Sequence, residues 1–312
     1  MVLKRYEKNP IIKPILEHPW ESYMTFNCAA IEIENKIHII YRARGVAGGI
    51  SRLGYAVTSD GFNIEERLEH PIYLPDPEND LEMFGCEDPR ITRIGDTLYM
   101  CYTAFGMVPG LTKRRINSVQ LAITTIKVKD FLNRKWNKWS KPIYPFPRVD
   151  NKDSFILSEK YKGKYVLYHR IPPHIWIAYS KDLKDWYNLR IIMQPKYDWE
   201  YAKLGGGAPS IKTNEGWLFI YHAVDRNYTY RLGAALIDLE NPERVIKRAK
   251  VPLLSPETPE EKTGDVGNVT FTCGAVVKND TLFVYYGAAD TVINVATAKL
   301  SDVIDFVKKE GE

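Results

Sequence analysis

The sequence predicts an all-β protein that forms one five-bladed β-propeller. Helical periodicity is scarce outside the C-terminus. Short apolar or alternating segments are separated by Gly, Pro, Asn and Asp, which is typical of strands joined by turns. Five of these segments share one pattern, an apolar strand that ends in Tyr followed by a small or polar residue. The tyrosines are Tyr41, Tyr102, Tyr168, Tyr221 and Tyr286. Five copies of one strand pattern in a single chain indicate a propeller.

The neighbours of each tyrosine strand also repeat. A turn signal such as Asn35-Lys36 or Gly95-Asp96 precedes the strand, and a third strand with a recurring Ala follows it. A first strand lies before each turn, expected at 28–33, 89–93, 154–158, 208–212 and 272–277. A fourth, outer strand is expected in each unit, although its pattern is less clear. The alternative is a β-sandwich with accidental similarity, which is disfavoured because all five copies keep the same internal order.

The C-terminal segment is the one part of the sequence with a reasonable helix pattern. Ser301 is a suitable N-cap, and Val303, Ile304, Phe306 and Val307 follow at helical spacing. We expect residues 1–312 to form a single catalytic domain with this short C-terminal helix.

Composition limits the class of protein. Of the 312 residues, 45% are hydrophobic and 26% are charged, which suits a globular chain with a sizeable core. The net charge of +4 is too small an excess to indicate nucleic-acid binding. No apolar run is long enough for a signal peptide or a membrane span, so we expect a cytoplasmic protein without a membrane partner. Whether the chain forms a homo-oligomer stays open.

The cysteines and histidines show no metal-binding pattern. Cys28, Cys86, Cys101 and Cys273 lie in or beside apolar stretches and lack close ligand spacing. Buried free thiols are expected, with disulfides as the less favoured alternative. The six histidines are scattered without a paired ligand motif. Neither a metal nor an organic cofactor is therefore expected.

Polar residues gather at the predicted strand ends. In a propeller blade, the start of the first strand and the end of the second lie on the same face. The residues at these places are Asn27, Glu87, Asp88, Lys152, Asp153, Gly205, Gly206, Gly207 and Asn268 at the starts, and Arg42, Arg44, Thr103, His169, Arg170, His222, Asp225 and Asp290 at the ends. Charged groups of both signs at one mouth indicate a pocket with an acid and an anion-binding capacity.

The sharpest local motif is Gly85-Cys86-Glu87-Asp88-Pro89-Arg90. Pro89 disfavours the α conformation at Asp88 and removes a backbone donor, so it fixes the direction of the Asp88 carboxylate. The alternative is that Asp88 caps a turn, a common role for Asp before Pro. The motif alone leaves both open.

The set of motifs resembles glycoside hydrolase family 130. The similar segments follow in order over nearly the whole chain, at 27–31, 41–43, 51–56, 85–90, 163–165, 217–223, 230–233 and 286–290. The resemblance implies a five-bladed propeller and inverting phosphorolysis of β-mannosides, although the family also contains hydrolases.

The resemblance assigns roles to single residues. It makes Asp88 the general acid, which protonates the glycosidic oxygen through the 3-hydroxyl of the sugar. It implies that Asn27, Arg42, Arg52 and Asp290 bind the sugar, and that Lys152, His222 and Tyr230 bind phosphate. A phosphate-binding arginine is also expected, either at Arg115 or at Arg170.

Several of these residues have structural alternatives. His169 and His222 could end a strand and bond to the backbone, Asp290 could cap a turn, and Tyr230 could simply pack in the core. Gly205-Gly206-Gly207 could form a flexible loop or a nest of amides beside an anion.

The balance of charges favours phosphorolysis. An inverting hydrolase needs a second carboxylate to activate water, whereas phosphate already carries negative charge and must only be neutralised and aimed. We therefore expect a small β-manno-oligosaccharide and inorganic phosphate as substrates and α-D-mannose 1-phosphate as a product. Two alternatives are a hydrolase in which Glu261 assists water and a non-catalytic sugar-binding propeller. The β-1,4 or β-1,2 linkage and the chain length stay open.

Overall fold

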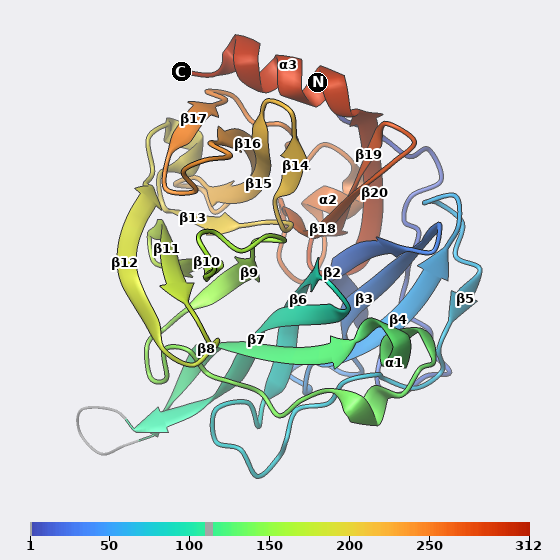
Figure 1. Cartoon of the computed structure of the whole chain (residues 1–312). Helices are drawn as coiled ribbons and strands as arrows, with labels where there is room; N and C mark the ends of the chain where they lie inside the picture. Colours follow the sequence, from blue (N-terminus) through green and yellow to red (C-terminus); the bar gives the residue numbers. More distant parts are fainter. Residues whose placement is uncertain (1, 110–114) are drawn as a thin grey trace.

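The computed structural model describes residues 2–109 and 115–312, without the side chains of residues 109 and 115. Its strands form five antiparallel sheets arranged around a central axis (Figure 1). The predicted five-bladed β-propeller is confirmed.

The blades follow one another in chain order. Blade 1 holds β2 (Met24–Ile33), β3 (Lys36–Arg44), β4 (Arg52–Thr58) and β5 (Glu66–Arg67), and blade 2 holds β6 (Gly85–Ile94), β7 (Thr97–Pro109) and β8 (Arg115–Lys127). Blade 3 holds β9 (Lys152–Ile156), β10 (Tyr165–Ile171), β11 (His174–Ser180) and β12 (Trp186–Met193). Blade 4 holds β13 (Lys203–Gly206), β14 (Ile211–Thr213), β15 (Gly216–Val224), β16 (Tyr230–Ile237) and β17 (Val245–Arg248). Blade 5 holds β18 (Thr270–Lys278), β19 (Thr281–Ala288), β20 (Val292–Lys299) and β1 (Lys4–Arg5).

Short helices connect or cover the blades. They are α1 (Val128–Leu132), η1 (Trp136–Lys138), η2 (Asp198–Glu200), α2 (Pro259–Lys262) and α3 (Leu300–Glu310). The predicted C-terminal helix is α3, which begins at Leu300 with Lys299 as its N-cap rather than Ser301.

The N-terminal strand completes the last blade. β1 pairs with β20 through Lys4 opposite Thr297 and Arg5 opposite Ala296. Two segments from opposite ends of the chain thus share one sheet and close the ring of blades. Blades 1, 3 and 4 carry their own outer strand, whereas blade 2 has three strands within the described residues.

The first strands begin earlier than predicted, because each contains an irregularity that hides its start. In blade 1, Phe26 pairs with Arg42 and Cys28 with Tyr41, so Asn27 is an extra residue in the strand. Blade 2 has the same shift between Glu87 and Arg90, beside Asp88. Asn27 and Asp88 have φ angles of 45° and 49°, a left-handed conformation that Asn and Asp tolerate better than most residues. Such bulges redirect side chains, here toward the axis.

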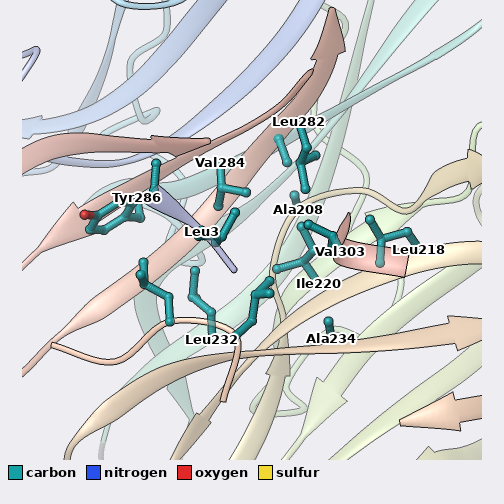
Figure 2. Close-up of a cluster of buried hydrophobic side chains, with 14 of the residues drawn as sticks. Leu3, Ala208, Leu218, Ile220, Leu232, Ala234, Leu282, Val284, Tyr286 and Val303 are labelled. Carbon is teal, nitrogen blue, oxygen red and sulfur yellow. The ribbon is translucent and has the colours of Figure 1, made fainter. Parts of the chain in front are cut away.

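Hydrophobic side chains fill the spaces between neighbouring blades. One buried cluster joins blades 4 and 5, where Leu218 and Ile220 of β15 face Leu282 and Val284 of β19 (Figure 2). Leu3 and the α3 residue Val303 belong to the same cluster. Four comparable clusters join blades 1 and 2, blades 3 and 4, blades 1 and 5, and blades 2 and 3.

The repeated tyrosines occupy equivalent, fully buried places. Four of them donate a hydrogen bond to a buried glutamate, with oxygen distances of 2.7 Å for Tyr41–Glu21, 2.5 Å for Tyr102–Glu82, 2.7 Å for Tyr221–Glu200 and 2.7 Å for Tyr286–Glu261. The fifth, Tyr168, donates to the carbonyl of Pro242. The tyrosine hydroxyl thus supplies a direct hydrogen-bond donor to each of these buried carboxylates.

A glycine lies under two of the tyrosine rings. A Cβ atom at Gly54 would lie 2.3 Å from the Tyr41 ring, and one at Gly233 would lie 2.3 Å from the Tyr221 ring. This close approach explains the Arg-Leu-Gly sequence at both 52–54 and 231–233.

All four cysteines are buried free thiols, as predicted. In the part of the chain that the structure describes, no helix is long and apolar enough to cross a membrane.

Candidate active site

A pocket of about 120 Å³ opens at the axis, and all five blades contribute to it. Its lining residues are Asn27, Arg42, Asp88, Lys152, Arg170, Lys203, Tyr230, Val266, Val269, Phe271 and Asp290. Four of these side chains are cations and two are carboxyl groups. The pocket is therefore suited to an anion.

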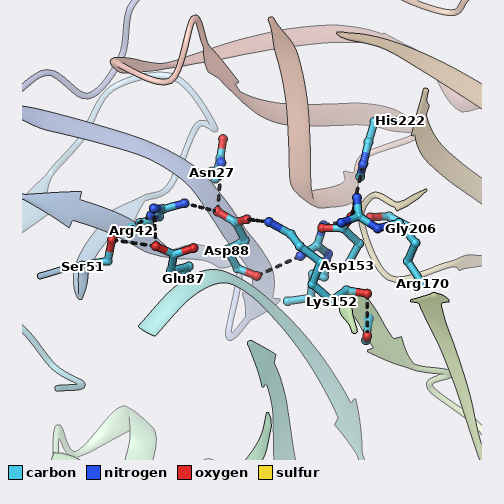
Figure 3. Close-up of polar contacts among 12 residues, drawn as sticks. Asn27, Arg42, Ser51, Glu87, Asp88, Lys152, Asp153, Arg170, Gly206 and His222 are labelled. Atoms are coloured by element: carbon cyan, nitrogen blue, oxygen red, sulfur yellow. Dashed lines mark hydrogen bonds and ion pairs between the residues drawn. The ribbon is translucent and has the colours of Figure 1, made fainter. Parts of the chain in front are cut away.

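Asp88 lies at the centre of the polar contacts (Figure 3). Its Oδ1 accepts hydrogen bonds from Asn27 Nδ2 at 2.9 Å and Arg42 Nη1 at 3.1 Å, and Lys152 Nζ lies 3.0 Å from its Oδ2. Burial raises the pKa of Asp88, but the charges of Lys152, Arg42 and Arg90 outweigh burial and hold this pKa below its ordinary value. Asp88 is therefore an ionised acceptor in this network.

Arg42 is held in place from several sides. Its Nε donates to Ser51 Oγ at 2.9 Å, its Nη2 pairs with Glu87, and its guanidinium lies 4.5 Å from the Phe26 ring centre. An arginine fork between two carboxylates has a well-defined orientation. It therefore presents a fixed positive charge to the pocket.

A second buried carboxylate, Asp153, lies behind the pocket. It pairs with Arg90 at 3.3 Å and with Arg170 at 2.5 Å, and His222 Nε2 lies 3.3 Å away. Burial raises the pKa of Asp153, but Arg170 and Lys152 bring it well below the ordinary value. The same charge network raises the pKa of Lys152, because the carboxylates of Asp88 and Asp153 outweigh burial. Lys152 is therefore a stable cation.

The glycines at 205–207 serve close packing. Gly205 and Gly206 belong to β13, and the carbonyls of Gly206 and Gly207 accept hydrogen bonds from Arg90 at 2.8 and 3.0 Å. A Cβ atom at Gly205 would lie 2.4 Å from the His222 ring. The structure thus corrects both earlier interpretations of this segment, the flexible loop and the amide nest.

Asp290 is the other carboxyl group of the pocket. Burial raises its pKa to about 7, with Arg42 opposing the rise and Asp88 adding to it. Asp290 therefore holds a proton up to neutral pH while Asp88 is ionised. Two carboxyl groups in one pocket with separated pKa values are a recurrent arrangement in acid–base catalysis.

Most of the predicted site residues come together. Asn27, Arg42, Asp88, Lys152, Arg170, Tyr230 and Asp290 all line the pocket. Arg52 does not line it, and its Nη1 donates instead to the carbonyl of Ile50 at 3.4 Å. Arg115 begins β8, but its side chain lies outside the described residues.

The two candidate histidines lie inside the protein. His222 is behind the pocket wall, with its ring centre 4.3 Å from that of Phe271. Burial lowers its pKa to about 4, and Asp153 only partly offsets this, so the ring is neutral at pH 7. His169 Nδ1 lies 3.0 Å from Asn151 Nδ2, and its ring stacks on Phe146.

Lys203 was missed by the sequence analysis. It lies on β13, lines the pocket, and places its ammonium 5.4 Å from the centre of the Tyr230 ring. Its position two residues before the glycine run was the available signal. That signal was hidden because the first strand of blade 4 was expected at 208–212.

Glu261 cannot activate water in this pocket. Its side chain is 0% exposed and is absent from the pocket lining. Arg5 Nε lies 2.7 Å from Oε1, Tyr286 donates to the same oxygen, and the backbone N–H groups of Glu257 and Thr258 donate to Oε2. The sequence-based alternative that Glu261 assists hydrolysis is therefore wrong. Glu261 is a buried structural carboxylate.

Comparison with known proteins identifies the family of the chain. A family model described as beta-1,4-mannooligosaccharide phosphorylase matches residues 2–309, so the chain belongs to glycoside hydrolase family 130. It is 44% identical over 308 residues to a 1,2-β-oligomannan phosphorylase and 46% identical over 314 residues to a β-1,2-mannobiose phosphorylase, both of Thermoanaerobacter sp. (strain X514). Each alignment covers 96% of this chain and 98% of the relative. The solved β-1,2-mannobiose phosphorylase of Listeria innocua, in complex with β-1,2-mannobiose, superposes with a TM-score of 0.81 at 29% identity, covering 99% of this chain and 100% of the other.

Proposed function

We propose that this protein is an inverting β-mannoside phosphorylase that uses inorganic phosphate to release α-D-mannose 1-phosphate. The observation that carries the proposal is the excess of cations in the small pocket, where Arg42, Lys152, Arg170 and Lys203 line the wall together with Asp88. Such a pocket neutralises an attacking dianion. The sequence similarity to mannoside phosphorylases supports the same activity.

In the proposed reaction, phosphate attacks the anomeric carbon of the mannosyl residue from the face opposite the leaving sugar. The bond from that carbon to the glycosidic oxygen breaks, and the oxygen takes a proton from Asp88, which must be protonated before this step. The proton that hydrogen phosphate carries balances the reaction, because mannose 1-phosphate leaves as a dianion. Asn27, Arg42 and Asp290 would hold the sugar hydroxyls, and Lys152, Arg170, Lys203 and Tyr230 would hold phosphate. Inversion of an equatorial β-linkage in this way gives the α-phosphate.

Lys152 would link phosphate binding to the protonation of Asp88. Its ammonium pairs with Asp88 at 3.0 Å, which stabilises the ionised form of the acid. Phosphate would draw this ammonium away from Asp88. The pKa of Asp88 would then rise, because its largest favourable charge has moved to another anion.

We further propose a β-1,2-linked substrate, mannobiose or a short oligomannan. The relatives at 44% and 46% identity bear β-1,2 names, whereas a β-1,4-mannooligosaccharide phosphorylase of Ruminococcus albus is 30% identical. The higher identity to the β-1,2 relatives favours a β-1,2 linkage over the β-1,4 linkage that the description of the family model names.

The test is the phosphate dependence of cleavage. Purified protein is incubated with β-1,2- or β-1,4-mannobiose at increasing phosphate, and mannose 1-phosphate is quantified. Cleavage of the β-1,2 disaccharide should rise from almost nothing to saturation, and the reverse reaction should run from mannose 1-phosphate. Equal cleavage without phosphate, with free mannose as product, would show a hydrolase. Sugar binding without any cleavage would show a non-catalytic propeller.

Lys152→Ala tests how the protein binds phosphate, which is the nucleophile of the proposed reaction. The change removes a charge-assisted contact worth about 1.5–3 kcal/mol, so the KM for phosphate should rise much more than the KM for mannobiose. Lys212→Ala is the control, because Lys212 pairs with Glu159 at the surface and should leave both constants unchanged. An unchanged KM for phosphate in Lys152→Ala would remove Lys152 from the phosphate site.

A further inference from the structure

Blade 4 contains a hollow of about 780 Å³, which we name the blade-4 hollow. Its walls come from η2, the β15–β16 hairpin and the segment between β17 and α2, and they include Asp198, Trp199, Asp225, Arg226, Asn227 and Arg231. Among the described residues, its lining and the lining of the active-site pocket have no member in common. The hollow is therefore a separate space, which the proposed reaction does not use.

The hollow lies close to the pocket, because the start of β16 forms a wall of both. Tyr230 lines the pocket, and the next residue, Arg231, lines the hollow. Successive side chains of a strand point to opposite faces, so these two neighbours face the two different spaces. On the neighbouring strand, Val224 pairs with Tyr230 on one side and with Lys203 on the other. A molecule in the hollow would thus lie one strand away from the active-site pocket.

A tight turn between β15 and β16 shapes the rim of the hollow. Asp225 Oδ1 accepts hydrogen bonds from the backbone N–H groups of Asn227 at 2.8 Å and Thr229 at 3.0 Å. Asp225 Oδ2 accepts one from Arg231 Nη1 at 2.6 Å. Both oxygens of this carboxylate hold the turn, and the next two side chains, Arg226 and Asn227, are exposed. The rim therefore needs little ordering when a ligand binds.

The rim carries polar groups that the protein itself does not use. The guanidinium of Arg226 lies 3.9 Å from the centre of the Tyr201 ring, which orients it. Within the described part of the chain, the side chains of Arg226, Asn227 and Asp198 have no hydrogen-bond partner. Together they offer donors and acceptors to the hydroxyl groups of a ligand.

Trp199 gives the hollow a fixed aromatic wall. Its Nε1 donates to the carbonyl of Lys250 at 2.8 Å, and its ring stacks on that of Tyr221 with the centres 6.0 Å apart. Trp20 in blade 1 is anchored in the same manner, with Nε1 on a backbone carbonyl and the ring on Tyr41. The tryptophan is thus a structural feature that two blades share. The part that blade 4 adds is the turn with open polar groups beside it.

The chemistry of the hollow fits a neutral saccharide. Two arginines and two aspartates balance in formal charge, so the hollow does not select an anion or a cation. The C–H faces of a sugar pack on aromatic surface, while its hydroxyls bind donors and acceptors at the edge. The active-site pocket offers only about 120 Å³, so most of a longer chain must lie outside it.

We infer that the blade-4 hollow is a second carbohydrate site, which binds part of a longer oligomannan chain outside the active-site pocket. The inference rests on the proposed function for the identity of the sugar. A chain held in the hollow stays close to the mouth between successive cleavages, which raises its effective concentration at the pocket. Long chains should gain from the hollow, and mannobiose should not.

The first experiment measures binding without turnover. Titration calorimetry is carried out in the Asp88→Asn background with β-1,2-linked mannohexaose or mannobiose. Adding Arg226→Ala or Asn227→Ala should weaken hexaose binding at least fivefold and leave mannobiose binding within twofold. Both side chains are exposed, so folding is not at risk. Arg244→Ala is the matched control, because Arg244 is an arginine outside the hollow that pairs with Asp238 at the surface.

The second experiment repeats the comparison by phosphorolysis with Asp88 intact. Arg226→Ala and Asn227→Ala should raise the KM for hexaose at least fivefold, with kcat within twofold and the KM for mannobiose unchanged. Absence of hexaose binding, unchanged hexaose affinity in both variants, or an equal loss for the two sugars would overturn the inference. A wild type without turnover would contradict the proposed function alone, because the calorimetric experiment still decides whether the hollow binds the chain.

Discussion

Asp88 accepts two hydrogen bonds on one oxygen and faces Lys152 with the other, whereas Asp290 lines the same pocket with a pKa of about 7. The difference follows from the neighbours. Asp88 has cations close enough to outweigh the cost of burial, and Asp290 does not. Below neutral pH the pocket thus holds one carboxylate and one carboxylic acid, and a proton must reach Asp88 before it can act as the general acid.

Asp88→Asn tests the general acid. Asn keeps the left-handed backbone that this position needs, with its φ of 49°, and occupies almost the same volume. We expect kcat to fall by roughly 10²–10⁴. Phosphate binding should be preserved or strengthened, because Lys152 loses its competing anion. Steady-state kinetics and calorimetry with phosphate check both effects, and near-wild-type turnover in a folded variant would show that another group supplies the proton.

Asp290→Asn tests the raised pKa through stability. Between the ordinary value of 3.8 and the folded value of about 7, the folded chain binds more protons than the unfolded chain, so this group makes stability fall as pH rises through that window. The variant should lose this part of the slope. The Tm of the variant minus the Tm of wild type should therefore be larger at pH 8 than at pH 4. Thermal unfolding in buffers free of phosphate and sulfate measures the difference, and parallel Tm profiles would contradict the assigned pKa.

At the scale of the strands, the repeated tyrosines could be predicted because burial imposes the same residue at the same place in each blade. The bulges could not, since a register shift depends on how two strands pair rather than on either strand alone. The first strands were consequently expected to begin too late, and Lys203 was overlooked. Arg52 is the opposite case, a residue that was predicted for the site but does not line the pocket. Its motif matches the family, but the motif does not say that the guanidinium turns toward Ile50.

Glu261→Gln tests the structural role of the tyrosine–glutamate pairs. Glu261 ties Tyr286 of β19 to Arg5 of the N-terminal strand. Breaking one partner of a buried ion pair costs about 3–5 kcal/mol, so the Tm should fall markedly. The kcat of the folded fraction should stay close to wild type, because Glu261 lies outside the pocket. A normal Tm with a large loss of turnover would instead indicate that Glu261 takes part in catalysis.

At the scale of the whole molecule, each hydrophobic cluster belongs to two blades. Unfolding any one blade would expose apolar surface on both of its neighbours. The pairing of β1 with β20 closes the ring, so opening the ring there requires that these strand hydrogen bonds break. The same closure holds the pocket together, since its lining comes from all five blades. Pocket geometry and global stability are therefore coupled.

We accordingly predict that residues 1–312 unfold as one domain, in a single calorimetric transition. Leu3→Ala probes the coupling, because Leu3 lies directly before β1 and is buried between blades 4 and 5. Truncating a buried leucine costs about 2–5 kcal/mol, and in a coupled ring this loss should lower the one transition as a whole. Turnover should disappear at the same temperature as the heat absorption peak, in wild type and variant alike. Two resolved transitions, with only the first shifted by Leu3→Ala, would show instead that blades 4 and 5 unfold separately from the rest.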